Sequence, residues 1–265
     1  MNNFFFQNIK KILINIFKFI GFIPKLKDIR VSKKSNKLKL YKTITGEYFL
    51  PKYHYQDIIR NHIIKNKIYD KPIFDCAKKY IKDESIFLDI GANYGQMSII
   101  ISKLKKNLET HSFEANNFIY YILKKNLELN KVVGKCYNVA VTDNITKSYY
   151  FPKENKDRFK TLGSYNLKEA ENFSSSNIKS LKIDDLSFDK NISFMKIDVQ
   201  GLDLNVMKGA KSTIIFHKMP IIFEYETLFQ NEMNYNFQEY INFVNEIDYK
   251  FENIIGSNNF LITPK

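Results

Sequence analysis

The chain has 265 residues, no tryptophan and only two cysteines, Cys76 and Cys136. These form neither a CxxC motif nor an even disulfide framework, which favours a reduced compartment. The four histidines are scattered, so no Cys/His cluster has the spacing of a zinc site and no metal is expected. The hydrophobic share of 44% and the charged share of 26% are typical of a globular protein. The length suits one large domain with an N-terminal extension.

The chain also lacks a strong run of basic residues, although its formal net charge is +13. A net charge of this size can attract nucleic acid, an acidic membrane or a phosphorylated substrate. The alternative is a compositional bias toward Lys, Asn, Ile, Phe and Tyr, as in proteins from AT-rich genomes. Because the lysines are dispersed, compositional bias is favoured, and nucleic acid is not an expected partner.

Residues 1–27 contain no apolar run suited to crossing a membrane, because Lys10, Lys11, Asn15 and Lys18 interrupt it. The segment lacks the charged leader and the small-residue cleavage site of a signal peptide. Its polar and apolar residues recur at helical spacing on opposite faces, which predicts an amphipathic helix. Such a helix lies in a membrane interface, or packs on its own domain or on a second subunit. The expected location is the cytoplasm, either free or peripheral at the inner face of the membrane.

Residues 28–84 are predicted to form an N-terminal region that contacts the substrate or another subunit. Within it, the alternating pattern of 37–50 predicts a β-hairpin, and short helices are predicted over 56–66 and 72–81.

From residue 85 to residue 265, strand and helix patterns alternate. The predicted strands are Ser85–Ile90, Glu109–Glu114, Cys136–Val141, 178–183, Ile192–Asp198, Pro220–Tyr225, Tyr249–Ile255 and Asn259–Thr263. The predicted helices are 94–107, 116–129, Leu202–Thr213 and 228–246, and 153–177 is predicted to be a loop. This alternation predicts an α/β fold with a mostly parallel sheet, to which the final hairpin adds an antiparallel strand.

The stretch FLDIGANYG, Phe87–Gly95, predicts a strand that runs through a glycine loop into a helix. Glycines there let the backbone approach a ligand closely. The spacing is D-x-G-x-x-x-G, which differs from the pyrophosphate-binding G-x-G-x-x-G, and no Walker phosphate loop is present. Asp89 at the strand end suits a ligand that carries positive charge and no phosphate.

Glu114 ends the next predicted strand. A carboxylate at that tip can accept hydrogen bonds from both hydroxyls of a ribose. The alternative is a solvent-facing acid at the start of the following helix, where the helix dipole favours it.

The stretch FMKIDVQG places Asp198 at the tip of a central strand, with Lys196 on the same side of the pleat. Asp198 therefore faces the expected ligand crevice, or else it caps the following helix. Glu224, at the end of the next strand, is a weaker candidate for the same crevice.

These segments together resemble the FkbM-type methyltransferase family. The matching stretches, in the family's order, are FLDIGANYG, HSFEANNFIYYILKKNLELN, NVAVTD, FMKIDVQGLDLNVMKGAKSTI and PIIFEYE, and they span roughly residues 85–226. The resemblance implies a Rossmann-like class I methyltransferase fold, S-adenosylmethionine as cofactor, and methylation of hydroxyls on sugars or other natural products.

The resemblance also implies roles for individual residues. Glu114 would hold the ribose, Ala140 and Val141 would flank the adenine, and Asp198 would lie beside the methyl group. The residues expected to bind the cofactor are Asp89, Gly91, Ala92, Asn93, Gly95, Glu114, Ala140, Val141 and Asp198. Those expected near the substrate are Ser164, Gln200 and His54.

The chain departs from the family at Gln200, where members commonly have glutamate in I-D-V-E-G. The amide keeps the hydrogen-bonding shape and loses the charge. Asp198 is therefore the first candidate for the base that removes the hydroxyl proton, with Glu224, His54 or His62 as second candidates.

The expected function is O-methylation of a sugar, a sugar nucleotide or a glycan precursor. One alternative is a methyltransferase acting on nucleic acid or on another small molecule, although an N-P-P-[YF] motif is absent. The other is a non-catalytic, membrane-associated binding protein that has kept the fold.

Overall fold

The computed structural model describes residues 37–146, 149–151, 167–169, 178–227, 235–255 and 258–265. The predicted amphipathic helix over residues 1–27 lies outside the described residues, and so does most of the predicted loop over 153–177. The chain divides at Leu38, and the fold described below belongs to the unit Lys39–Lys265.

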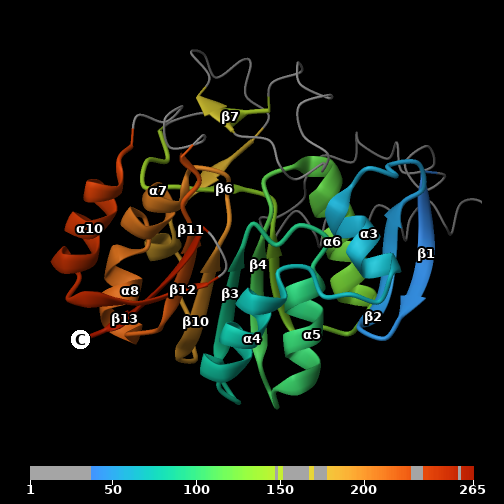
Figure 1. Cartoon of the computed structure of the whole chain (residues 1–265), viewed down its shortest axis with the longest axis horizontal. Coiled ribbons are helices and arrows are strands. Elements are labelled where there is room, and N and C mark those ends of the chain that lie inside the picture. Colours follow the sequence, from blue (N-terminus) through green and yellow to red (C-terminus); the bar gives the residue numbers. More distant parts are fainter. Residues whose placement is uncertain (1–36, 147–148, 152–166, 170–177, 228–234, 256–257) are drawn as a thin grey trace, which may run out of the picture. The chain divides into compact units, whose positions relative to one another are not determined.

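Seven strands form the main sheet, in the order β12-β13-β11-β10-β3-β4-β5 (Figure 1). They are β3 Ile86–Ile90, β4 Glu109–Phe113, β5 Gly134–Tyr137, β10 Ile192–Ile197, β11 Ile221–Glu224, β12 Tyr249–Ile255 and β13 Asn259–Pro264. β11, β10, β3, β4 and β5 run parallel, while β13 pairs antiparallel with β11 and β12. The predicted sheet, mostly parallel with an antiparallel C-terminal hairpin strand, is confirmed.

Helices cover both faces of this sheet (Figure 1). On one face lie α4 Lys71–Tyr80 and α5 Gln96–Leu104, whose apolar residues pack on Phe87 and Phe194. On the other face lie α7 Asp203–Lys208, α8 Lys211–His217 and α10 Phe237–Glu246, which pack on Leu88 and Met195. Neighbouring strand residues thus point to opposite faces, as the period of two requires. Each fully buried apolar side chain of this size contributes roughly 1.5–3 kcal/mol.

The predicted N-terminal hairpin and short helices are also confirmed, as β1 Leu38–Thr43, β2 Gly46–Pro51, α3 Ile58–Ile64 and α4. Two asparagines, one in α6 Asn117–Leu129 and one directly after it, bind the backbone of β2. Asn126 Oδ1 accepts from the Phe49 amide at 2.7 Å, and Asn130 Nδ2 donates to the Glu47 carbonyl at 2.7 Å. These contacts fix β2 to the helix that follows β4.

The strand predicted over Cys136–Val141 is wrong as a single element. β5 ends at Tyr137, where the Asn138 side chain donates to the carbonyls of Glu114 and Ala115 and turns the chain out of the sheet. β6 Ala140–Val141 then pairs with β9 Ser180–Leu181, which is the only strand found within the predicted 178–183 segment of the described chain. A further small ladder joins β7 Tyr149–Tyr150 to β8 Lys168–Glu169.

The helix predicted over Leu202–Thr213 is two helices, α7 and α8, which meet at Gly209. A Cβ on Gly209 would lie 2.2 Å from the Thr142 carbonyl oxygen, so the break accompanies a close approach of two backbones. The helix predicted over 228–246 begins at Phe237, after a capping box between Asn236 and Glu239, and residues 228–234 lie outside the described chain. No helix among the described residues is long and apolar enough to cross a membrane.

Candidate active site

A pocket of about 360 Å³ opens at the carboxyl ends of β3, β4, β10 and β11. The strand order reverses between β3 and β10, which is where open α/β sheets bind their ligands. The predicted site residues that line it are Asp89, Gly91, Ala92, Asn93, Glu114, Ala140, Val141, Asp198, Gln200 and Glu224. Gly95 stands behind the loop as the N-cap of α5. The structure therefore brings most of the predicted residues together.

The glycine loop is fixed by backbone contacts on both sides. The amides of Gly91 and Ala92 both donate to the Phe113 carbonyl at 3.0 Å. Gly91 has a φ of 80°, and a Cβ there would lie 1.9 Å from the Asp198 carbonyl oxygen. Glycine is needed here because the loops that follow β3 and β10 touch at this point.

Glu114 lies at the tip of β4 with both carboxylate oxygens bound to main-chain amides. Oε2 accepts from Asn93, which has a φ of 51°, at 3.1 Å, and Oε1 accepts from Asn116 at 2.8 Å. Burial raises the pKa of Glu114 to about 7, although these two hydrogen bonds oppose the rise. The alternative of a solvent-facing acid at the helix start is wrong, because Glu114 is buried and Asn116 caps α6.

Asp89 is buried beneath the loop, on the face of β3 that carries α5. Its Oδ2 accepts from the Ser98 hydroxyl at 2.6 Å, and its Oδ1 lies 3.8 Å from Lys196 Nζ. Burial raises the pKa of the Asp89 carboxyl, and the charge of Lys196 offsets part of that rise. This carboxyl is thus engaged by protein groups at the floor of the pocket.

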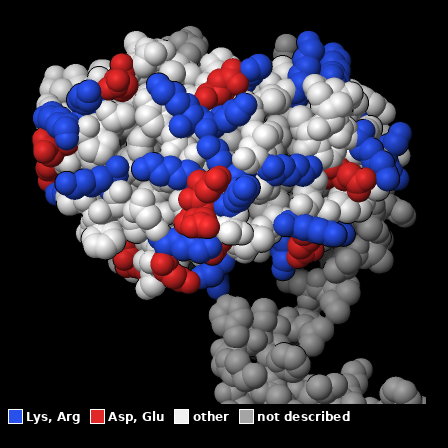
Figure 2. Space-filling view, turned by 90° about the horizontal axis from the view of Figure 1, so that it is seen from below, with Lys and Arg blue, Asp and Glu red and all other residues white. Residues whose placement is uncertain are grey.

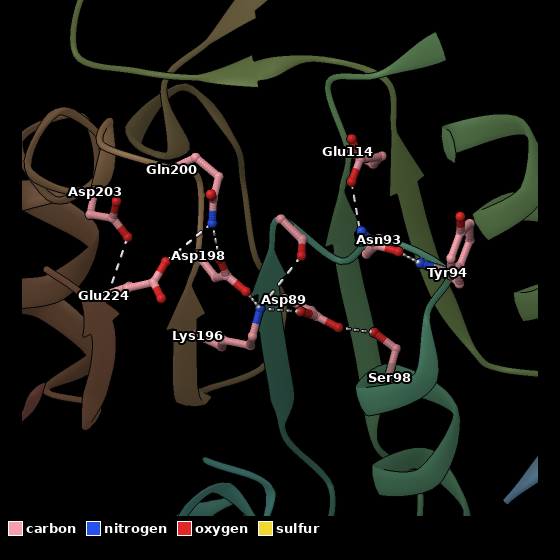
Figure 3. A network of polar contacts seen from close by, with 11 residues as sticks. Asp89, Asn93, Tyr94, Ser98, Glu114, Lys196, Asp198, Gln200, Asp203 and Glu224 are labelled. Carbon is pink, nitrogen blue, oxygen red and sulfur yellow. Dashed lines mark hydrogen bonds and ion pairs between the residues drawn. The ribbon is translucent and has the colours of Figure 1, made fainter. Parts of the chain in front are cut away.

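Asp198 follows β10 and belongs to a chain of polar contacts (Figure 3). Its Oδ2 accepts from Lys196 Nζ at 3.1 Å, and its Oδ1 accepts from Gln200 Nε2 at 3.1 Å. The same Gln200 nitrogen donates to Glu224 Oε2 at 3.1 Å. The alternative of Asp198 as a helix cap is wrong, because the N-cap of α7 is Leu202. Asp198 is instead held in the pocket from two sides.

Lys196 is buried between Asp89, which is also buried, and Asp198, which is partly exposed. Burial alone would lower the pKa of Lys196, but the carboxylates of Asp198 and Asp89 outweigh it and raise the pKa above its usual range. Lys196 therefore stays charged and orients the Asp198 carboxylate.

Glu224 lies among other acids at the end of β11. Burial, together with the charges of Asp198 and Asp203, raises the pKa of Glu224 to about 10. Asp203 is fully buried and accepts from the amides of Gly201 at 3.2 Å and Glu224 at 3.4 Å. At neutral pH, Glu224 is therefore a protonated acid that donates a hydrogen bond more readily than it accepts a proton.

Acidic groups dominate the pocket. The carboxyls that line it are Asp70, Asp89, Glu114, Asp198, Glu224 and Glu226, and the one lining cation among the described residues is Lys196. The outer surface differs, since Figure 2 shows Lys and Arg side chains spread among Asp and Glu across the face seen from below. A chain of net charge +13 thus contains a pocket that attracts positive charge.

The N-terminal region supplies one wall of the pocket through Ile59, Tyr69 and Asp70. Gln96 fixes this wall to α5: its Oε1 accepts from the Tyr69 amide at 2.9 Å, and its Nε2 donates to the Lys67 carbonyl at 2.9 Å. The segment between α3 and α4 is therefore part of the site.

The candidate histidines lie apart from the pocket lining. His54 is exposed in the connection between β2 and α3. His62 is half-buried on α3, where its Nδ1 lies 2.9 Å from the Ile58 carbonyl and its ring meets Tyr69 edge-on at 5.5 Å. Ser164 lies outside the described residues.

The sequence analysis does not single out several polar residues in or near the pocket, among them Tyr69, Asp70, Asp203 and Glu226. The sequence does signal Glu226, because it lies two residues beyond Glu224, just past the end of β11. Asp70 precedes Lys-Pro at a helix start and Asp203 lies in the first turn of α7, so each resembles an ordinary helix-start acid.

The pocket fits S-adenosylmethionine in three respects. Its acids suit the sulfonium and ammonium charges, Glu114 has lone pairs left for ribose hydroxyls, and Gly91 lets the glycine loop meet the loop after β10 at the pocket. Ala140 and Val141 give the apolar surface that an adenine ring needs. Within the described residues, no group of three or more His, Cys, Asp and Glu side chains is arranged to hold a metal ion.

Several solved structures are similar to this chain. A methyltransferase FkbM from Methylobacillus flagellatus shares 16% identity with a TM-score of 0.46, over 69% of this chain and 44% of that one. A precorrin-6y C5,15-methyltransferase from Geobacter metallireducens shares 16% identity with a TM-score of 0.40, over 72% and 85%. A TehB-like SAM-dependent methyltransferase from Corynebacterium glutamicum shares 9% identity with a TM-score of 0.42, over 78% and 94%.

Among curated protein sequences, none matches the chain at a significant level. The profile of the methyltransferase FkbM domain family matches residues 89–251, which is more than half of the chain. This range contains the glycine loop, Glu114 and the acids that follow β10 and β11. The chain therefore belongs to the FkbM family of S-adenosylmethionine-dependent methyltransferases.

Proposed function

We propose that this protein transfers the methyl group of S-adenosylmethionine to a hydroxyl oxygen of a sugar, a sugar nucleotide or a glycan precursor. The observation that carries the proposal is the position of Asp198, a carboxylate held by Lys196 and Gln200 in the same pocket as Glu114.

S-adenosylmethionine supplies a methyl group activated by the positive charge on sulfur. The acceptor oxygen forms its bond to carbon as the carbon–sulfur bond breaks, and the sulfur keeps the electron pair. A neutral hydroxyl must lose its proton as this happens, and we assign the acceptance of that proton to Asp198. The remaining acceleration comes from alignment of the two reactants.

The charges around Asp198 support a hydroxyl acceptor over nucleic acid. Glu226 and Asp70 line the same pocket as Asp198. These acids would repel the phosphates of a polynucleotide, each of which carries a negative charge. A non-catalytic, membrane-associated role would leave this arrangement unexplained.

The test is transfer of a radiolabelled methyl group from S-adenosylmethionine to a panel of acceptors. The panel contains a methyl hexopyranoside, an amino sugar, a sugar phosphate, a sugar nucleotide and tRNA. We expect label on a carbohydrate hydroxyl, recovered as an O-methyl ether by mass spectrometry. Label on tRNA alone, or on a nitrogen atom, would overturn the proposal.

A further inference from the structure

Asp70 occupies the N-cap position of α4 without capping the helix. An N-cap aspartate is normally extended and accepts a hydrogen bond from the second or third helical amide. Asp70 instead has φ 49° and ψ 48°, and its side chain makes no capping hydrogen bond. Pro72 removes one of the two amides that could have been capped. Aspartate is a common N-cap residue, but the Asp70 side chain does not cap α4.

Asp70 is one of the residues that line the pocket, and it is half-buried there. Burial and the negative charge of Asp198 raise the pKa of Asp70 to about 6, while Lys196 and His62 act in the opposite direction. Tyr69 beside it is affected by the same groups, since burial, Asp70 and Asp198 raise its pKa above the usual range. Asp70 and Asp198 thus line the same pocket, and the charge of Asp198 acts on the Asp70 carboxyl.

This placement costs stability in three ways. The left-handed backbone is unfavourable for a residue other than glycine, although aspartate tolerates it better than most. A helix that lacks a side-chain cap is less stable than a capped one. The charge is partly desolvated beside another carboxylate. Local costs of this kind collect at functional sites, where the surrounding structure enforces them.

The surroundings do enforce this geometry. Gln96, which stands at the start of α5 directly after the glycine loop, binds both the Tyr69 amide and the Lys67 carbonyl. The turn that carries Asp70 is thereby fixed to the element that forms the cofactor loop. Asp70 is thus presented to the pocket before any ligand binds.

We propose that Asp70 binds the acceptor, by accepting a hydrogen bond from a second hydroxyl next to the one that Asp198 deprotonates. The inference rests on the proposed function and narrows it. The acceptor is a polyhydroxylated compound whose diol spans the space between the two carboxylates, and it carries no phosphate near the methylated position. Asp70 lies outside the range of the family match, 89–251, so this contact belongs to the chain's own N-terminal region.

The first experiment combines a substitution in the enzyme with a deletion in the substrate. Wild type and Asp70→Asn are assayed with a methyl hexopyranoside and its monodeoxy analogues, and S-adenosylmethionine affinity is measured by calorimetry. Asp75→Asn is the matched control, because Asp75 is exposed on the same helix in an ion pair with Lys71.

In wild type, loss of the second hydroxyl should raise KM by about 10- to 150-fold, the usual range for a hydrogen bond to a charged group. Asp70→Asn should raise KM for the parent glycoside by a similar factor, lower kcat less, and leave cofactor affinity within about twofold. With the Asp70→Asn enzyme, the deoxy analogue should have the same KM as the parent glycoside. Unchanged KM in an active Asp70→Asn enzyme would overturn the inference, whereas a wild type that methylates no carbohydrate would overturn the proposed function.

The second experiment needs no acceptor. Because the pKa of Asp70 is higher in the folded chain, this carboxyl lowers stability as pH rises from about 4 to about 6. The melting temperature is measured for both proteins at about pH 4.5 and at about pH 7. The difference between Asp70→Asn and wild type should shift in favour of the variant by roughly 2–4 °C at the higher pH. A variant that is less stable than wild type at both values would mark Asp70 as a structural cap and overturn the inference.

Discussion

The two sides of the pocket are built differently. On the side of Gly91 and Glu114, main-chain amides and carbonyls hold the geometry. On the side of Asp198, Gln200 and Glu224, side chains hold one another. The first side is built from elements that follow each other directly in the chain: β3, the glycine loop, α5 and β4. The second side combines β10 and β11 with Tyr69 and Asp70, which lie more than 120 residues earlier in the chain.

This difference separates the two tasks of the site. A main-chain frame suits a cofactor that is the same in every reaction cycle, because backbone groups change little from one sequence to another. Side chains can be exchanged one at a time, so the acidic side can determine which acceptor enters and how its proton leaves. Substitutions on the first side should therefore affect cofactor affinity, and those on the second side should affect turnover.

The largest effect is expected for Asp198→Asn. An amide cannot accept a proton at neutral pH, so turnover should fall by roughly 10²–10⁴-fold while the fold and cofactor affinity persist. The measurement pairs single-turnover methyl transfer with calorimetry of S-adenosylmethionine, and exposed Asp248→Asn serves as the control. A variant with near-normal turnover would remove Asp198 from the mechanism.

Gly91→Ala should give the next largest effect, on the cofactor side. The new Cβ would lie 1.9 Å from the Asp198 carbonyl, at a φ of 80°, so both loops must shift. We expect a loss of about 2 kcal/mol or more in stability and no measurable cofactor binding by calorimetry.

Gly134→Ala separates these two effects. Gly134 also approaches a backbone closely, since a Cβ added there would lie 2.0 Å from the Thr110 carbonyl oxygen, but it lies outside the pocket lining. That variant should lose stability in thermal unfolding and keep its cofactor affinity. If both variants lost binding equally, the effect at Gly91 would be one of general stability.

The same contrast explains what could be predicted from the sequence. The glycine loop, Glu114 and Asp198 lie at strand ends within short stretches, so periodicity and spacing place them correctly. Asp70 could not be found in this way, because its role depends on a left-handed backbone and on neighbours far away in the chain. The end of the strand at Tyr137 could not be predicted from local sequence either. Asn138 turns the chain there through contacts with residues at the end of β4.

Glu114→Ala should have an intermediate effect that is confined to the cofactor. Loss of a charge-assisted hydrogen bond costs roughly 1.5–3 kcal/mol, which corresponds to about 10- to 150-fold in S-adenosylmethionine affinity. Calorimetry measures this directly, with Glu128→Ala on the exposed side of α6 as the control. Tight binding of NAD in place of S-adenosylmethionine by the wild type would instead contradict the assignment of this whole side of the pocket.

The smallest expected effect is the pH dependence of stability on the acidic side. The ordinary pKa of a glutamate is 4.5, and in the folded protein burial and the charges of Asp198 and Asp203 raise the pKa of Glu224 to about 10. Between these values the folded chain binds more protons than the unfolded chain, so the free energy of unfolding falls as pH rises. The contribution is complete below pH 4.5 and is lost as pH approaches 10.

Glu224→Gln should remove this dependence, because the amide keeps the shape and does not titrate. A full shift corresponds to about 1.4 kcal/mol per pH unit, and solvent screening should reduce the change between about pH 6 and about pH 8 to about 1 kcal/mol. Urea unfolding at both pH values measures it, with exposed Glu246→Gln as the control. The Glu224→Gln variant should gain stability relative to wild type as pH rises between these two values. Parallel curves for the two proteins would mean that Glu224 is ionised in the folded chain, and it would then compete with Asp198 as the proton acceptor.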